Sequence, residues 1–169
     1  DVTFEGVKTT NSLLMLAPIS NNCGRIIFRN CEMSLAPGAI ITSSADGIHL
    51  GSNRFGVIID NCEFGNSFDD LINTQTYSGE ITKIINDYTY ETSRDMFCSV
   101  GDEIKFFNTS NHEIVGTAFL KEIEKKEDGG YRLTVDRKVY KVLSQETSNT
   151  PTSMYNLDSA NKGNIIKNS

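Results

Sequence analysis

Short runs of apolar, mostly β-branched residues recur through the first 77 residues and are separated by glycine, asparagine and serine. Each run has the length of a short strand, and none shows the i, i+3, i+4 spacing of an amphipathic helix. The pattern predicts strands at 13–16, 25–28, 39–42, 47–50, 57–59 and 71–72. Residues 1–4 are also strand-like, so we expect the chain to be a fragment or a processed piece of a longer polypeptide.

Two of these strands belong to an internal repeat. Residues 26–33 (IIFRNCEM) line up with residues 57–64 (VIIDNCEF), 31 residues further on (Asn30 to Asn61), and a partial third copy occupies 165–169. A repeat of this size without a helix is typical of a β-solenoid, in which each coil stacks on its neighbour. Asparagines at equivalent turns can form a hydrogen-bonded ladder there, with Cys or Ser stacked beside it. A β-sandwich with two similar strands is the alternative.

The pattern changes after residue 77, where charged residues become more frequent and the predicted strands lengthen to 80–85, 103–107, 114–123 and 131–135. The turn at 127–130 (EDGG) lies between two alternating strands and predicts a hairpin. A polar linker with Pro151 then leads back to the repeat pattern. We therefore predict solenoid coils over 1–77, an inserted small antiparallel β-barrel over 78–150, and a return to the solenoid over 151–169.

The composition and net charge of the chain exclude several classes of function. Hydrophobic residues make up 38% and charged residues 22% of the chain, as in a globular protein. Lys and Arg number 16 against 22 Asp and Glu, a net charge of −6, which disfavours a nucleic-acid partner. No apolar run approaches the ~18 residues of a membrane span, and no signal peptide is visible. The four cysteines form no CxxC pair and have no histidine at zinc-ligand spacing, so we expect buried thiols and no metal site.

Three aspartates carry the candidate chemistry. Asp46 precedes Gly47, and the pair Asp69–Asp70 follows 23 residues later (Asp46 to Asp69), close to the length of one short coil. Adjacent coils lie ~5 Å apart, so the three carboxyl groups are expected to cluster. Such a cluster can hold both a protonated and an ionised carboxyl group, which glycoside hydrolysis requires. The alternative is a structural role, in which the aspartates only cap backbone amides in turns.

Other polar residues could assist the three aspartates. His49 would lie near Asp46 if 47–50 is a strand, and Asn73 follows the acidic pair. Tyr77 could stack on a sugar ring, although an aromatic side chain at a domain junction more often packs. Glu103 is a further acid in the inserted region, where a solvated strand face is the commoner role.

Several motifs resemble glycoside hydrolase family 110, the α-1,3-galactosidases. The motifs of the first region are 45–49 (ADGIH), 58–64 (IIDNCEF) and 69–73 (DDLIN), followed by Tyr77. In the second region, 101–106 (GDEIKF) and the strands over 114–135 are similar to the family's small β-barrel insertion, and 156–160 (NLDSA) resembles its return to the solenoid. The similarity runs through nearly the whole chain, which covers only the middle of a family member.

The resemblance implies an all-β fold, with a right-handed parallel β-helix that carries an inserted small antiparallel β-barrel. It implies an inverting exo-α-1,3-galactosidase without cofactor or metal, a carbohydrate partner (terminal α-linked galactosides), and a periplasmic or extracellular location. Asp46, Asp69 and Asp70 match the family's acidic positions. We expect His49, Asn73 and Tyr77 to bind substrate. Glu103 is a candidate for an additional acid. The family usually continues Asn-Val-His-Gly after the acidic pair, whereas residues 73–76 read NTQT.

Three alternatives stay open. A polygalacturonase-like hydrolase also has Asp-Gly followed by Asp-Asp on a β-helix, but its His-Gly and Arg-x-Lys signatures are absent here. A non-catalytic carbohydrate-binding or adhesin β-helix would use the acids to cap turns or to hold sugar hydroxyls. A purely structural solenoid would have no sugar affinity.

Overall fold

The computed structural model describes residues 1–12, 14–127 and 129–169, and across these ranges the fold is all-β, with sixteen strands and no helix. The predicted all-β class is confirmed. Within the same ranges, no helix is long and apolar enough to cross a membrane. Leu13, in the predicted strand 13–16, and Asp128, in the predicted turn 127–130, lie outside the described residues.

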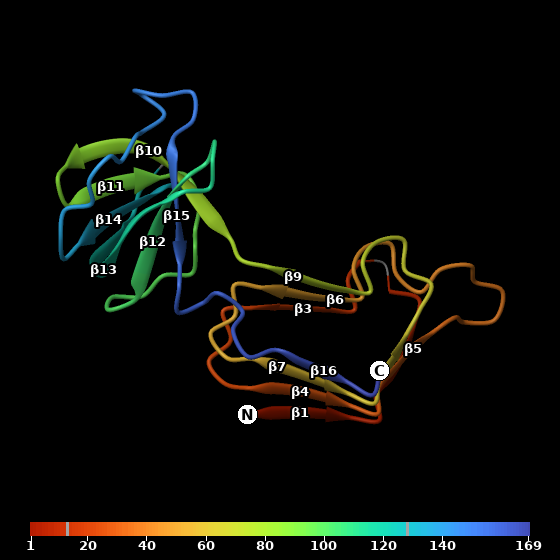
Figure 1. Ribbon diagram of the computed structural model, residues 1–169. Coiled ribbons are helices and arrows are strands. Elements are labelled where there is room, and N and C mark those ends of the chain that lie inside the picture. Colours follow the sequence, from red (N-terminus) through yellow and green to blue (C-terminus); the bar gives the residue numbers. More distant parts are fainter. Residues whose placement is uncertain (13, 128) are drawn as a thin grey trace. The chain divides into compact units, whose positions relative to one another are not determined.

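The chain divides into two compact units (Figure 1). Unit 1 comprises residues 1–76 and 161–169, and unit 2 comprises residues 77–160. Each is described below by itself.

Unit 1 contains three separate parallel sheets (Figure 1). The first sheet has the order β1 (Val2–Glu5), β4 (Ile26–Arg29), β7 (Val57–Asp60) and β16 (Ile165–Lys167). The second has the order β2 (Lys8–Thr10), β5 (Glu32–Ser34) and β8 (Glu63–Phe64), and the third β3 (Ala17–Ser20), β6 (Ile48–Gly51) and β9 (Ile72–Gln75). The chain thus passes through the three sheets in the same order three times, and β16 begins a fourth pass.

The repeat found in the sequence sets the register of the first sheet. Ile26 pairs with Val57, and Ile165 pairs with Ile58. Directly after β4, β7 and β16 the chain turns in the left-handed region at Asn30, Asn61 and Asn168, with φ of 52°, 51° and 57°. Asparagine tolerates this conformation better than most residues. The Asn61 side-chain amide donates to Asn30 Oδ1 at 2.7 Å, so the expected ladder is confirmed.

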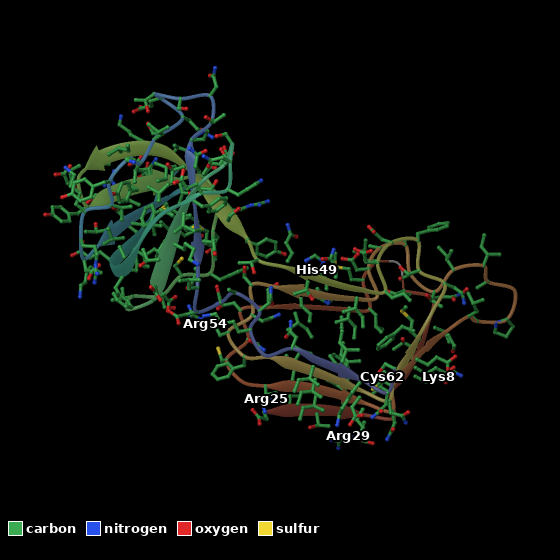
Figure 2. All side chains as sticks on the ribbon, in the orientation of Figure 1. Lys8, Arg25, Arg29, His49, Arg54 and Cys62 are labelled. Atoms are coloured by element: carbon green, nitrogen blue, oxygen red, sulfur yellow. The ribbon has the colours of Figure 1, made fainter. Side chains whose placement is uncertain are left out.

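The thiols next to this ladder are buried, as expected. Cys31 and Cys62 follow Asn30 and Asn61 and are 6% and 4% exposed (Figure 2 labels Cys62). Ser169 occupies the next equivalent position, where its hydroxyl accepts a hydrogen bond from the Cys62 N–H at 3.1 Å. For the other two cysteines the expectation of buried thiols is wrong, because Cys23 is exposed and Cys98 is half-buried.

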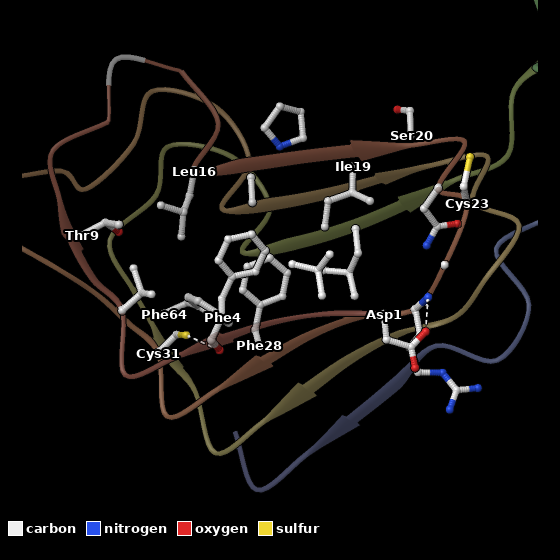
Figure 3. A pocket seen from close by; sticks show the side chains of 18 of the residues that line it. Asp1, Phe4, Thr9, Leu16, Ile19, Ser20, Cys23, Phe28, Cys31 and Phe64 are labelled. Atoms are coloured by element: carbon white, nitrogen blue, oxygen red, sulfur yellow. Dashed lines mark hydrogen bonds between the residues drawn. The ribbon is translucent and has the colours of Figure 1, made fainter.

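The interior of unit 1 is apolar, because alternate residues of the first and third sheets point inward. Its fully buried members are Ile48, Leu50, Val57 and Ile59. Beyond β1 the interior opens into a cavity of about 770 Å³ (Figure 3). Phe4 and Phe28 line it, with their rings stacked 5.1 Å apart.

Two predicted strands of unit 1 are wrong. Residues 39–42 belong to an irregular connection between β5 and β6, and residues 14–16 precede β3, which begins at Ala17. In this connection Ile40 is 83% exposed, whereas Thr42 is buried and its N–H donates to the Asn66 carbonyl at 2.9 Å. Thr42 is therefore buried in a loop that is tied to the neighbouring loop, and its composition imitates that of a strand.

Unit 2 is a closed antiparallel barrel of six strands (Figure 1). Around the barrel the order is β10 (Ser78–Asn86), β11 (Thr89–Thr92), β14 (Tyr131–Val135), β13 (Ile114–Lys125), β12 (Glu103–Asn108) and β15 (Thr152–Asn156). Its interior includes the fully buried Ile81, Tyr90, Ile104, Phe106 and Leu120.

The last barrel strand differs from the sequence expectation. The sequence assigns Thr152–Asn156 to the returning solenoid, whereas in the structure β15 pairs with β10 and β12. The physical reason is that Met154 is fully buried among the barrel core and Asn156 donates to Asp102 Oδ2 at 2.7 Å. The chain therefore rejoins unit 1 only at Asn161.

Candidate active site

The register of the third sheet brings Asp46 beside Asp70. Ile48, the first residue of β6, pairs with Ile72, the first residue of β9, and each aspartate precedes its strand by two residues. The Gly47 N–H donates to the Asp70 carbonyl at 2.9 Å, which links the two loops directly. Neighbouring strands lie ~4.8 Å apart, so side chains at equivalent positions come within reach of one another.

Gly47 is needed for this approach. A Cβ atom at position 47 would lie 2.4 Å from the Leu71 carbonyl oxygen, closer than real Cβ atoms come to backbone. Glycine has no Cβ, so the two loops can close on each other. The Asp-Gly pair singled out in the sequence is thus an acid followed by the residue that lets its loop touch the next one.

The structure brings Asp46, Asp69 and Asp70 together. One carboxylate oxygen from each lies within 4.8 Å of the other two. Asp46 is 3% exposed, whereas Asp69 and Asp70 are exposed. Three carboxylates this close repel one another when all are ionised. Oxygen ligands of this kind suit a hard divalent ion, but exposed acidic groups are common without one.

His49 lies on β6 and is 9% exposed (labelled in Figure 2). Its Nδ1 atom is 2.5 Å from Oδ2 of Asp46, so the imidazole contacts the cluster through Asp46. The expected proximity of these two side chains is confirmed. Asn73 is the register partner of His49 on β9 and is half-buried. Residues in register share one face of the sheet, which places the Asn73 amide next to the imidazole.

Tyr77 and Glu103 belong to unit 2, and their positions are described only there. The Tyr77 ring lies 5.8 Å from that of Phe97, with the Arg94 guanidinium 5.7 Å above it. Glu103 begins β12, and its N–H donates to Asp158 Oδ2 at 2.8 Å. The substrate contact of Tyr77 and the acid role of Glu103 stay predictions.

Two serines in the loops that carry the aspartates were not predicted from the sequence. The hydroxyls of Ser43 and Ser67 both donate to the Ala45 carbonyl at 2.7 Å, and Ser67 Oγ accepts from the Asp69 N–H at 3.1 Å. These bonds fix the two loops that carry the acids. The signal was available, because Ser43 and Ser67 have the same 24-residue separation as Asp46 and Asp70.

Similarity to known proteins bears on the chemistry of the acidic cluster. No protein-family model matches the chain. The chain is 26% identical over 106 residues to alpha-1,3-galactosidase B of Akkermansia muciniphila, and the match covers 59% of this chain and 13% of that protein. The chain therefore spans a small part of its relative's length. The similarity supports a distant, galactosidase-like relationship.

Proposed function

We propose that this chain carries the acidic site of a glycoside hydrolase that releases terminal α-linked galactose. The observation that carries the proposal is the cluster of Asp46, Asp69 and Asp70, with oxygens within 4.8 Å on adjacent turns before β6 and β9. Carboxyl groups in close pairs are the usual machinery of glycoside hydrolysis. The substrate class is supported by the relative named alpha-1,3-galactosidase B.

The proposal includes the finer architecture. We infer that the three parallel sheets of unit 1 are the faces of a right-handed β-helix, because the chain passes through them in one order with its strands in register. Right-handed crossovers are the rule for parallel strands. The acids then lie at the edge of one face, open to a sugar chain. A periplasmic or extracellular location is part of the same proposal and rests on the family resemblance.

The exposed pair has the access that the chemistry needs. In hydrolysis, a carboxylic acid protonates the glycosidic oxygen as the bond to the anomeric carbon breaks, and a carboxylate takes a proton from the water that adds there. We assign Asp69 and Asp70 to proton transfer and to holding the sugar. Asp46 is 3% exposed, and we assign it an assisting role beside them.

The spacing of the carboxylates bears on the stereochemical course. Inversion, which the resemblance implies, usually needs carboxyl groups ~6.5–9.5 Å apart to admit a water, whereas retention uses ~5–5.5 Å. Oxygens within 4.8 Å are nearer to the retaining geometry.

Proton NMR of the anomeric signals tests the function. The purified protein is mixed with α-1,3-linked galactobiose and followed from the first minutes. Release of β-galactose shows inversion, and release of α-galactose shows retention. Asp69→Asn and Asp70→Asn should stop release, and Glu63→Gln, an exposed carboxylate on β8, should not. Binding of the disaccharide without any product would overturn the proposal in favour of a non-catalytic carbohydrate-binding protein.

A further inference from the structure

The contact between Asp46 and His49 is unusual for its burial. The Asp46 side chain is 5% exposed and the His49 side chain 11%, and Nδ1 lies 2.5 Å from Oδ2. A carboxylate in its ionised form only accepts hydrogen bonds, and the imidazole beside it would then donate from Nδ1. The bond on one ring nitrogen of a histidine sets which nitrogen carries the proton. Asp46 therefore determines the protonation pattern of His49, and His49 determines where the Asp46 carboxylate points.

The sheet holds the imidazole in place. β6 is the middle strand of the third sheet, and His49 lies in register between Pro18 on β3 and Asn73 on β9. Its chain neighbours Ile48 and Leu50 are fully buried in the core. A side chain flanked on both sides within a packed sheet has little freedom to leave its rotamer. The imidazole is thus a rigid anchor for Asp46.

We propose that His49 is a positioning residue that acts through Asp46 and makes no contact with the sugar. This inference rests on the proposed function. The Nδ1–H of His49 engages Oδ2 of Asp46, which leaves the other carboxylate oxygen for the cluster. Contact with the sugar falls to the exposed pair, Asp69 and Asp70.

The first test reads the imidazole directly and needs no catalysis. The chain has two histidines, so long-range ¹H–¹⁵N NMR resolves both, and His112→Asn assigns them. We expect the neutral His49 ring to carry its proton on Nδ1. Asp46→Asn keeps a carbonyl acceptor and should preserve this tautomer, whereas Asp46→Ala should shift the proton to Nε2. A wild-type ring protonated on Nε2 would overturn the inference.

The second test separates positioning from substrate contact. His49→Asn retains an N–H donor near the place of Nδ1 and should keep kcat within about tenfold. His49→Leu should lower kcat by about 10²-fold with KM nearly unchanged, because misplacing a catalytic group costs about that much. A raised KM at unchanged kcat would overturn the inference, since His49 would then bind the sugar. His112→Asn, at an exposed turn of unit 2, is the matched control.

The two tests distinguish failure of the inference from failure of the proposed function. If Asp69→Asn and Asp70→Asn hydrolyse galactobiose as fast as the wild type, the proposed function is wrong, yet the tautomer result still tests the Asp46–His49 pair. If those variants are inactive and His49→Leu is fully active, the positioning role is wrong while the function stands. Should His49→Leu fail to fold, the tautomer of the wild-type protein and the kinetics of His49→Asn decide.

Discussion

Both units bury carboxylates, and two of these, Glu91 and Asp46, lie in different electrostatic settings. In unit 2, Glu91 is 7% exposed and accepts hydrogen bonds from Lys126 Nζ and Arg132 Nη2, both at 2.9 Å. These two cations lower the pKa of Glu91 below its usual value. In unit 1, Asp46 is 3% exposed, contacts His49, and has the carboxylates of Asp69 and Asp70 within 4.8 Å.

The difference separates a structural carboxylate from a candidate functional one. Glu91 is neutralised where it stands, so its burial is compensated locally. Asp46 has the carboxylates of Asp69 and Asp70 close by in addition to His49, and close carboxylates persist mainly where chemistry needs them. Replacing Glu91 and a carboxylate of this cluster by their amides should therefore have opposite consequences for activity and stability.

The largest expected effect is on the rate of hydrolysis. Asp70→Asn should lower kcat by about 10²–10⁴-fold, the usual contribution of a general acid or base, and should leave the fold intact. Glu91→Gln should leave kcat unchanged and weaken the barrel. Kinetics on α-1,3-galactobiose together with thermal unfolding compare the two variants. Equal rates in Asp70→Asn and Glu91→Gln would contradict the distinction between a functional carboxylate in unit 1 and a structural one in unit 2.

A change in the backbone between the acids should affect both properties. Gly47→Ala forces a methyl group against the Leu71 carbonyl oxygen, so the loops before β6 and β9 must separate. We expect a loss of about 2–3 kcal/mol in the free energy of unfolding, as for overpacked sites, and a slower reaction because the aspartates move apart. Gly65→Ala is the matched control, since no atom lies within 4 Å of its added Cβ. Denaturant unfolding and kcat measure the pair; equal behaviour of the two variants would contradict the prediction.

The pH dependence of stability sharpens the role of Glu91. A carboxyl group whose folded-state pKa is lowered stabilises the fold fully above its unfolded pKa, ~4.3 for Glu, and loses this contribution as pH falls through the folded pKa. The difference in unfolding free energy between wild type and Glu91→Gln should be about 1.5 kcal/mol at pH 7. It should shrink below about pH 4.3. Chemical unfolding between pH 3 and 7 measures it, and a difference that grows on acidification would exclude this ion pair as its source.

The sequence was most informative where contacts repeat. The copies at 26–33 and 57–64 predicted the register of the first sheet and the Asn30–Asn61 ladder, because a repeated side chain at a repeated position meets itself. Spacing also anticipated that Asp46 would meet Asp69 and Asp70. In these cases the spacing of residues in the sequence directly predicts which residues lie next to each other on adjacent strands.

Prediction failed where the partner of a segment is decided by tertiary packing. Thr152–Asn156 reads TSMYN and shows no alternation, and only the closure of the barrel between β10 and β12 decides its partners. Strands as short as β8 (Glu63–Phe64) have too few residues to show a period. Closeness in the sequence placed His49 near Asp46, but its burial follows from β6 lying between two neighbours.

The smallest expected effect concerns the ladder that aligns unit 1. Asn61 contributes two things: an amide bonded to Asn30 Oδ1 at 2.7 Å and a tolerated left-handed backbone with φ of 51°. Asn61→Ala loses both and should cost about 1–2 kcal/mol. Asn61→Gly keeps the backbone freedom and should cost less, and Gly6 already occupies the equivalent turn after β1 with φ of 61°.

The barrel supplies the comparison for this ladder. Thr89 and Thr134 are register partners on β11 and β14, and their hydroxyls lie 3.3 Å apart. Thr134→Val removes that contact without altering the backbone preference, so it should cost less than Asn61→Ala. Measuring the unfolding free energies of Asn61→Ala, Asn61→Gly and Thr134→Val ranks the contributions of these hydrogen bonds and of the backbone conformation. If Asn61→Gly were as costly as Asn61→Ala, the side-chain amide alone would hold the turn, and the stacking of unit 1 would depend on its hydrogen bonds more than on its backbone conformation.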